Sequence, residues 1–333
     1  MHAPDGFLNA GTAVATGAVS AGTIGVALRR TRETLLDTQV PLAGLAAAFV
    51  FAAQMLNFPV AAGTTGHLLG GALAAVLLGP AAGALVVAVV VIVQAVAFAD
   101  GGLTALGYNI LNMAIITAFG GYGVYLLARR LLPGTGTSVV VATGVAAFAS
   151  VALSSMAFSI EWLFGATAPV PFDTVFAAVV GVHGLIGVGE AVISALAVGA
   201  VLASRPDLVH GARDLGRTAA ARRPAIGMRG FAIGAAVVAL TLATVVSQFA
   251  VPGPDGLAKA ATETGFADQG RPHALSDAVF SGYATAGVDN EALSLAVAGA
   301  VGVAITLAVG YGMFAAVGDR RRDRGPAGPR APA

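Results

Sequence analysis

Cysteine is absent from this sequence of 333 residues, and lysine occurs once, at Lys259. The lack of cysteine excludes disulfides, thiolate metal sites and cysteine nucleophiles. Because Lys259 does not follow a glycine-rich loop, the sequence also lacks the phosphate-binding loop through which many proteins bind ATP. A His-Glu-x-x-His pair, which would indicate a membrane metalloprotease, is missing too. Any metal bound here must therefore have nitrogen or oxygen ligands.

Charged residues are scarce, at 11%, whereas 57% of the residues are hydrophobic. Apolar runs of about 20 residues are long enough to cross a membrane, so the sequence predicts an all-α polytopic membrane protein. Segment 66–79 is short for a span, and only Gly79-Pro80 separates it from segment 81–99. The two are either a tight hairpin or one broken helix. The expected helices lie near 8–28, 41–60, 66–79, 81–99, 103–128, 137–163, 172–203, 229–250 and 292–317.

Arginine gathers at alternate helix ends, which we expect to face the cytoplasm. Of the Lys and Arg residues, only Lys259 and Arg271 are expected on the opposite side. The protein is therefore predicted to lie in a cytoplasmic membrane with its N-terminus facing outward. No basic region or cleavage site precedes the first apolar run, and we therefore expect the mature chain to begin at Met1. The net charge of +1 gives no indication of a nucleic-acid partner. The arginine clusters are Arg29, Arg30 and Arg32, Arg129 and Arg130, Arg205 through Arg229, and Arg320 through Arg324.

A charged stretch at 204–228 interrupts the apolar pattern and predicts a domain boundary. It separates a first unit of seven helices, 1–203, from a two-helix unit at 229–318 with a long outward loop. Residues 319–333 are rich in Pro, Gly and Arg and are expected to form a disordered tail.

The start of the chain offers an unusual set of metal ligands. Met1 contributes its terminal amine, and His2 contributes its backbone amide, once deprotonated, and its imidazole. Three such nitrogens suit the tetragonal preference of Ni(II), Cu(II) and related divalent metals. One further ligand would complete a four-coordinate site. The alternative interpretation is a loose terminus with an incidental histidine.

Polar side chains at membrane depth are expensive to bury and are therefore candidates for function. His67 is predicted at the outward start of the third helix, level with the N-terminus, which makes it the expected fourth ligand; it could also be an ordinary helix-start histidine. Gln54 and Asn57 lie three apart and are predicted to share one face of the second helix. Both precede Pro59, which is expected to end that helix.

Two further pairs lie in later helices. Asn109 and Asn112 are also three apart, and such amides can orient a metal-binding histidine or simply join helices by hydrogen bonds. His183 and Glu190 are seven apart and are predicted to share a face. We expect Glu190 to be structurally paired, with a role in ion passage as the alternative.

Four segments together resemble the CbiM/NikM family, the substrate-capturing membrane components of energy-coupling-factor transporters for cobalt and nickel. They are Met1-His2-Ala3-Pro4-Asp5-Gly6-Phe7-Leu8, Ala53 through Val60, Gly66 through Gly71, and His183 through Glu190. The resemblance covers residues 1 to about 203. Further along, Pro254-Asp255-Gly256-Leu257 is similar to the Pro-Asp-Gly-Leu-Glu signature of a small accessory subunit, with Ala258 in place of Glu.

The resemblance implies a seven-helix substrate component with a fused accessory unit, and metal ligands at Met1, His2 and His67. Gln54, Asn57, Asn109 and Asn112 are then candidates for orienting those ligands. It also implies a transporter subunit rather than an enzyme. Co²⁺ or Ni²⁺ would be the substrate, with no cofactor. A membrane coupling subunit and ATP-binding subunits would be its partners, alongside membrane lipid.

Two other functions remain open at this point. A self-sufficient carrier or channel would use His183 and Glu190 to relay protons. An intramembrane metalloenzyme would use the histidines to activate water, although no general base is evident in the sequence.

Overall fold

The computed structural model of the chain describes residues 1–61, 63–215 and 224–322, and these are almost entirely helical. Within these residues, seven helices are long and apolar enough to cross a membrane: 10–34, 80–97, 106–131, 136–165, 172–204, 228–249 and 291–318. The prediction of an all-α polytopic membrane protein is confirmed. The helices are α1 (Ala10–Thr34), α2 (Gln39–Gln54), α3 (Gly71–Leu78), α4 (Pro80–Ala97), α5 (Leu106–Ile110), the π-helical η1 (Leu111–Gly120), α6 (Gly121–Leu131), α7 (Gly136–Gly165), α8 (Phe172–Ser204), α10 (Met228–Thr244), α11 (Gly256–Thr264) and α12 (Glu291–Arg322).

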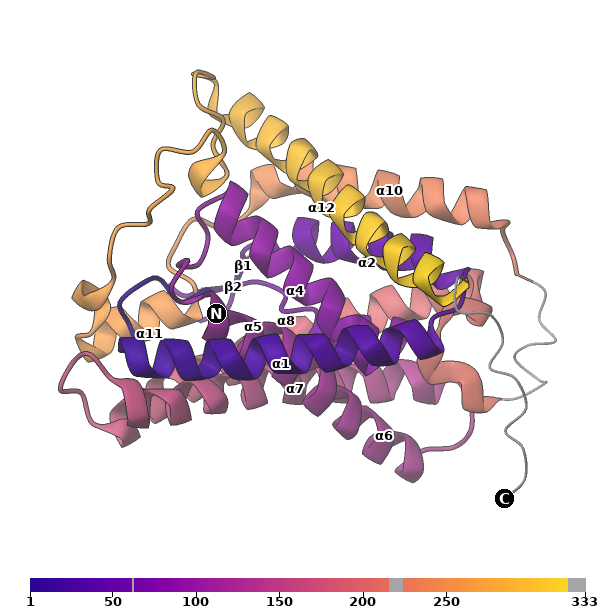
Figure 1. Cartoon of the computed structure of the whole chain (residues 1–333), viewed down its shortest axis with the longest axis horizontal. Coiled ribbons are helices and arrows are strands. Elements are labelled where there is room, and N and C mark those ends of the chain that lie inside the picture. The colour runs from indigo at the N-terminus through magenta and orange to yellow at the C-terminus, as the bar shows by residue number, and fades with distance from the viewer. Residues whose placement is uncertain (62, 216–223, 323–333) are drawn as a thin grey trace.

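Short elements occupy the connections. Two-residue strands, β1 (Phe58–Pro59) and β2 (Thr65–Gly66), pair antiparallel. Short 3₁₀ helices are η2 (Pro206–Leu208), η3 (His210–Leu215), η4 (Val246–Phe249), η5 (Ala267–Gln269) and η6 (Ser281–Tyr283). In Figure 1 the N-terminus lies beside β2 and α11, toward the end of the bundle that carries the loop between α10 and α12.

Helices α3 and α4 form a tight hairpin, which settles the alternative left open by the sequence. Gly79 adopts a φ of 94° between them, and Pro80 begins α4. A side chain at Gly83 would lie 2.5 Å from the backbone nitrogen of Ala75, so the two helices fold directly against each other. The eight residues of α3 rise only about 12 Å, too little to cross a hydrocarbon core. Helix α3 is therefore a half-depth element that begins where the N-terminus is docked.

The helix from Leu106 to Leu131 contains a π-helical stretch, η1, that starts just after Asn109. A wider turn shifts the direction of the following side chains relative to a regular α-helix. Asn109 consequently contacts the N-terminal segment, whereas Asn112 donates to Glu161 of α7 at 2.7 Å. The two asparagines thus serve different contacts despite their regular spacing.

The C-terminal helices pack closely on the first unit, with α12 lying along α2. Small residues allow this approach, because a side chain at Gly44 would lie 3.0 Å from the Cβ of Tyr311, and one at Gly310 would lie 3.1 Å from the Cβ of Ala47. Small residues are the usual means of close helix approach within membranes. Figure 1 shows α12 crossing over α10 and α2.

Part of the predicted linker at 204–228 is ordered and packed. The Tyr125 hydroxyl donates to the carbonyl of Gly211 at 2.6 Å, and Arg129 pairs with Asp214 at 2.7 Å. Residues 216–223 of that linker lie outside the described residues. Helix α12 continues to Arg322, beyond the predicted start of the tail at 319, which agrees with the high helix propensity of arginine. The remaining tail residues, 323–333, also lie outside the described part.

Candidate metal site

The first residues of the chain are docked into the protein through their backbone. Asn109 accepts from the amide of Ala3 and donates to its carbonyl, both at 3.0 Å. Gly102 donates to the same carbonyl at 3.0 Å, and Tyr108 donates to the carbonyl of Pro4. Met1 is consequently only 3% exposed. Asn109 therefore positions the N-terminal segment through its backbone, whereas the predicted role was to orient a histidine ring.

Asp5 fixes the next turn of this segment. One carboxylate oxygen accepts from the amide of Thr104 at 2.7 Å, from its hydroxyl at 2.6 Å and from the amide of Ala105 at 3.2 Å. The carbonyl of Asp5 accepts from the amide of Arg271, in the loop of the C-terminal unit, at 2.7 Å. Both units of the chain thus hold the N-terminal segment.

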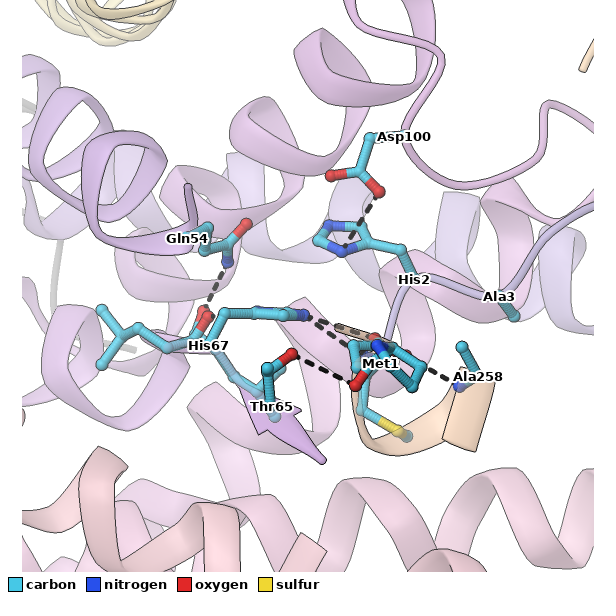
Figure 2. A network of polar contacts seen from close by, with 12 residues as sticks. Met1, His2, Ala3, Gln54, Thr65, His67, Asp100 and Ala258 are labelled. Atoms are coloured by element: carbon cyan, nitrogen blue, oxygen red, sulfur yellow. Dashed lines mark hydrogen bonds and ion pairs between the residues drawn. The ribbon is translucent and has the colours of Figure 1, made fainter. Parts of the chain in front are cut away.

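His67 follows directly from strand β2 and faces the amine of Met1, as Figure 2 shows. Its Nδ1 lies 3.0 Å from the carbonyl of Leu68. Because a carbonyl oxygen only accepts, the hydrogen of the neutral ring must be on Nδ1. The lone pair of Nε2 is therefore directed away from Leu68, and this atom lies 3.2 Å from the amine nitrogen of Met1.

The turn that carries His67 is held by two polar side chains from other helices. Glu190 of α8 accepts from the amides of Leu69 and Gly70, at 2.6 and 2.8 Å. Gln54 of α2 donates to the carbonyl of Leu69 at 2.9 Å. The prediction that Glu190 is structurally paired agrees with these contacts. Together, these two residues fix the position of His67 relative to the bundle.

The imidazole of His2 stacks on that of His67, with ring centroids 5.1 Å apart. Its Nε2 lies 3.0 Å from Oε1 of Gln94, and its Nδ1 lies 3.6 Å from a carboxylate oxygen of Asp100. Burial lowers the pKa of His2 to about 4, although Asp100 acts in the opposite direction. The ring is therefore neutral near pH 7 and must turn from Gln94 and Asp100 before it can bind a metal beside Met1.

Asp255 of the C-terminal unit reaches the same place. Its Oδ2 lies 2.8 Å from the amine of Met1 and 3.6 Å from Nε2 of His67. The backbone next to it is anchored to β2, because the amide of Thr65 donates to the carbonyl of Pro254 at 3.0 Å. Burial by itself would raise the pKa of Asp255, but the nearby ammonium of Met1 and His67 outweigh it and hold the pKa well below its usual value.

His183 lies beneath this cluster in α8. Its Nδ1 contacts the carbonyl of Val179 at 2.7 Å, and its buried Nε2 has no hydrogen-bond partner among the described residues. Met1, His67 and His183 line one small cavity. The ring of His183 is thus near the proposed ligands, whereas Glu190 on the same helix holds the turn of His67.

Two other predicted residues lie away from the site. Helix α2 ends at Gln54, because the chain turns there into β1, so Asn57 is outside the helix and does not share its face. The backbone carbonyl of Asn57 accepts from the amide of Val251 at 2.9 Å. Asn112 is directed to Glu161. Neither residue orients a histidine of the site in this structure.

Gln94, Asp100 and Asp255 were not predicted as site residues from the sequence. Gln94 interrupts an apolar run, which is visible in the sequence, and the structure shows that it is completely buried. The Tyr283 hydroxyl donates to Asp100 at 2.6 Å and accepts from Gln94 at 3.1 Å, so it joins the two partners of His2. Asp255 carried a different signal, because it belongs to the Pro-Asp-Gly-Leu signature.

Within the described residues, no group of three or more His, Cys, Asp or Glu side chains is arranged to hold a metal ion. A metal site here therefore depends on the amine of Met1 as well as on side chains. The available donors are one amine, two imidazoles and one carboxylate, a mixture suited to late first-row divalent metals.

Fold and site together define a multi-pass, all-α membrane protein with its N-terminal amine buried among histidine and aspartate side chains. Residues 2–208 match the family described as the cobalt uptake substrate-specific transmembrane region, and residues 229–319 match the PDGLE domain. The first match covers more than half of the sequence. The chain belongs to this cobalt-uptake family and carries a fused PDGLE domain, as the resemblance implied.

Curated relatives and solved structures agree with this assignment. The chain is 34% identical over 313 residues to the putative fused nickel transport protein NikMN of Archaeoglobus fulgidus, covering 94% of this chain and 98% of that protein. It is 39% identical over 209 residues to a putative metal transport protein of Haloquadratum walsbyi, covering 63% and 93%. A crystal structure of a truncated transition metal transporter superposes with a TM-score of 0.54 at 32% identity, covering 61% of this chain and 98% of that one.

Proposed function

We propose that the protein captures a divalent transition metal, Co²⁺ or Ni²⁺, for uptake across the membrane. The observation that carries the proposal is the 3.2 Å contact between the amine of Met1 and Nε2 of His67. The tautomer of His67 leaves the Nε2 lone pair available on the side of the amine. Relatives named as nickel and cobalt transport proteins support the same substrate class.

The proposed ligands are the amine of Met1, the amide and imidazole of His2, and His67. The His2 ring is already stacked on His67, so a rotation of its side chain can bring an imidazole nitrogen to the metal. Loss of the amide and ammonium protons accompanies binding, so affinity is expected to fall as pH decreases. Four nitrogens in one plane suit nickel better than cobalt.

We further propose that the protein is the substrate-specific component of an energy-coupling-factor transporter. In this arrangement a membrane coupling subunit and ATP-binding subunits supply the energy, and the N-terminal end of the bundle faces outward from the cytoplasmic membrane. Residues 1–203 are the capturing domain and 229–318 the accessory domain. The position of the Met1 amine at one end of the bundle, opposite the C-terminal end of α12, supports this orientation.

The substitution His67→Ala tests the function. It removes one of four proposed ligands, and Ni²⁺ affinity, measured by calorimetry on purified protein, is expected to fall at least a hundredfold. Uptake of radioactive ⁶³Ni²⁺ by cells that also produce the partner subunits is expected to be lost. His273→Ala is the matched control, because His273 lies in the loop of the C-terminal unit, outside the cluster around Met1. Unchanged binding and uptake by His67→Ala would show that the site is elsewhere.

A further inference from the structure

Three donor atoms from distant parts of the chain form a small triangle at the N-terminus. The amine of Met1 lies 3.2 Å from Nε2 of His67, Oδ2 of Asp255 lies 2.8 Å from that amine, and the third side, from Oδ2 to Nε2, is 3.6 Å. A point near the centre of this triangle lies about 2 Å from each atom, which is the usual bond length from a divalent transition metal to nitrogen or oxygen. The carboxylate therefore lies at bonding distance from the place where a metal would contact Met1 and His67.

We propose that Asp255 is a direct ligand of the transported metal, in the fifth position beside the four nitrogens. The inference rests on the proposed function and adds a ligand to that site. In the metal-free chain, the ammonium of Met1 is directed at Asp255 and His67. The metal takes the place of the one proton that leaves this ammonium, the amine keeps its other two hydrogens, and the three heavy atoms need only small adjustments.

Charge balance favours the same assignment. A divalent ion bound to a deprotonated His2 amide leaves a net charge of +1 on the complex. Met1 and His67 are 3% and 6% exposed, and a charge buried at such a place is costly unless it is compensated. The carboxylate of Asp255 makes the loaded site neutral. The ammonium of Met1 has the same charge, so Asp255 balances the site in both states.

The local structure around Asp255 leaves one of its oxygens for the metal. Oδ1 caps α11 by accepting from the amide of Ala258 at 2.8 Å, whereas Oδ2 faces Met1. Figure 2 shows Met1 with His67 on one side and Ala258 of α11 on the other. The side chain of Ala258 is exposed, so the departure from glutamate at this position does not alter the contact.

Gly256 explains why this turn can come so close. A side chain at Gly256 would lie 2.6 Å from Cδ1 of Ile186 and 3.0 Å from Cε1 of His183, closer than ordinary packing allows. Leu257 follows as a buried anchor, 1% exposed. In the Pro-Asp-Gly-Leu signature, glycine thus allows the close approach, leucine anchors the turn, and aspartate places its carboxylate beside the N-terminal amine.

The substitution Asp255→Asn tests the inference in the full-length protein loaded with Ni²⁺. Asparagine caps helices as well as aspartate does, so α11 is expected to remain folded. Nickel K-edge X-ray absorption is expected to show five ligands in the parent and the edge feature of planar four-coordinate Ni²⁺ in the variant. The Ni²⁺ affinity is expected to fall at least tenfold. Asp277→Asn makes the same change of charge at an exposed position in the same loop and is expected to leave both measurements unchanged.

The parent spectrum is decisive even if the variant fails to fold. A planar four-coordinate signature in the parent, or identical spectra in the parent and Asp255→Asn, overturns the assignment of Asp255 as a ligand. Failure of the proposed function would give different results. In that case the parent binds no nickel, or it binds nickel equally well with His67 replaced. Loss of binding in His67→Ala with no effect of Asp255→Asn would leave the function standing and remove only this inference.

Discussion

At the scale of single residues, the site depends on side chains that position other groups. Asn109 forms hydrogen bonds with the amide and the carbonyl of Ala3, and Glu190 accepts from the two amides of the turn that follows His67. These contacts hold the N-terminal segment and His67, which carry proposed ligands, in place in the absence of metal. Preorganisation of this kind raises affinity, because less freedom is lost on binding.

Asn109→Ala removes two hydrogen bonds to the backbone of Ala3. Each such bond contributes about 1 kcal/mol, so we expect the docked N-terminal segment to be destabilised by about 2 kcal/mol and Ni²⁺ affinity to fall roughly thirtyfold. Calorimetry on folded protein measures this directly. Asn112→Ala is the matched control. It removes the same type of side-chain amide, but that amide donates to Glu161 and not to the N-terminal segment. An equal loss of affinity in both variants would contradict the positioning role of Asn109.

His2 gives a pH prediction. The docked ring has a pKa of about 4, below the usual 6.5, because burial disfavours its charged form. Between pH 6.5 and 4, a released His2 therefore binds a proton that the docked one does not, and docking weakens as pH falls through this range. Hydrogen exchange of residues 2–8 without metal is expected to show less protection at pH 5 than at pH 7, after correction for intrinsic rates.

In His2→Gln, which lacks the titrating group, this loss of protection should be much smaller. A pH effect of equal size in both proteins would assign it to another group.

At the scale of secondary structure elements, the contact between α2 and α12 connects the C-terminal unit to the site. Leucine at Gly310 would collide with Ala47 of α2, whereas a side chain at Gly312 meets nothing within 4 Å. Gly310→Leu is expected to cost about 1–3 kcal/mol of stability, as overpacked cores do.

Displacement of α12 is also expected to weaken Ni²⁺ binding, because the loop that carries Asp255 leads into this helix. Gly312→Leu, on the same helix, should change neither the melting temperature nor the affinity appreciably. Equal melting temperatures and affinities for both leucine variants would show that the close packing of α2 and α12 is unimportant.

The secondary structure elements also show which features of the fold could be predicted from the sequence. Apolar runs located the nine apolar helical segments, because length and hydropathy are properties of each segment alone, but they did not reveal the short helix α11. The prediction that Gln54 and Asn57 share a helix face was wrong, because the chain leaves the helix after Gln54 to form β1. The different contacts of Asn109 and Asn112 depend on the π-helical stretch, which regular spacing does not reveal.

For the molecule as a whole, the proposed metal site combines residues from both units of the chain. Met1 and Asp255 are 254 positions apart and meet at 2.8 Å. The chemistry of their nitrogens and their position at one membrane level made Met1, His2 and His67 candidates, and the family resemblance implied that the three are the ligands. It did not predict Asp255 as a site residue, because its approach depends on how the two units pack, which residue types and spacing do not encode.

The central claim is that the terminal amine of Met1 binds the metal. The most direct measurement is a titration of the purified protein with Ni²⁺ and Co²⁺, alongside a variant extended by one residue ahead of Met1. We expect tight binding of one ion per chain in the parent and its loss in the extended protein, because the new peptide bond removes the amine. Equal binding by both proteins would contradict this expectation and would direct the search to His183 and the loop between α10 and α12.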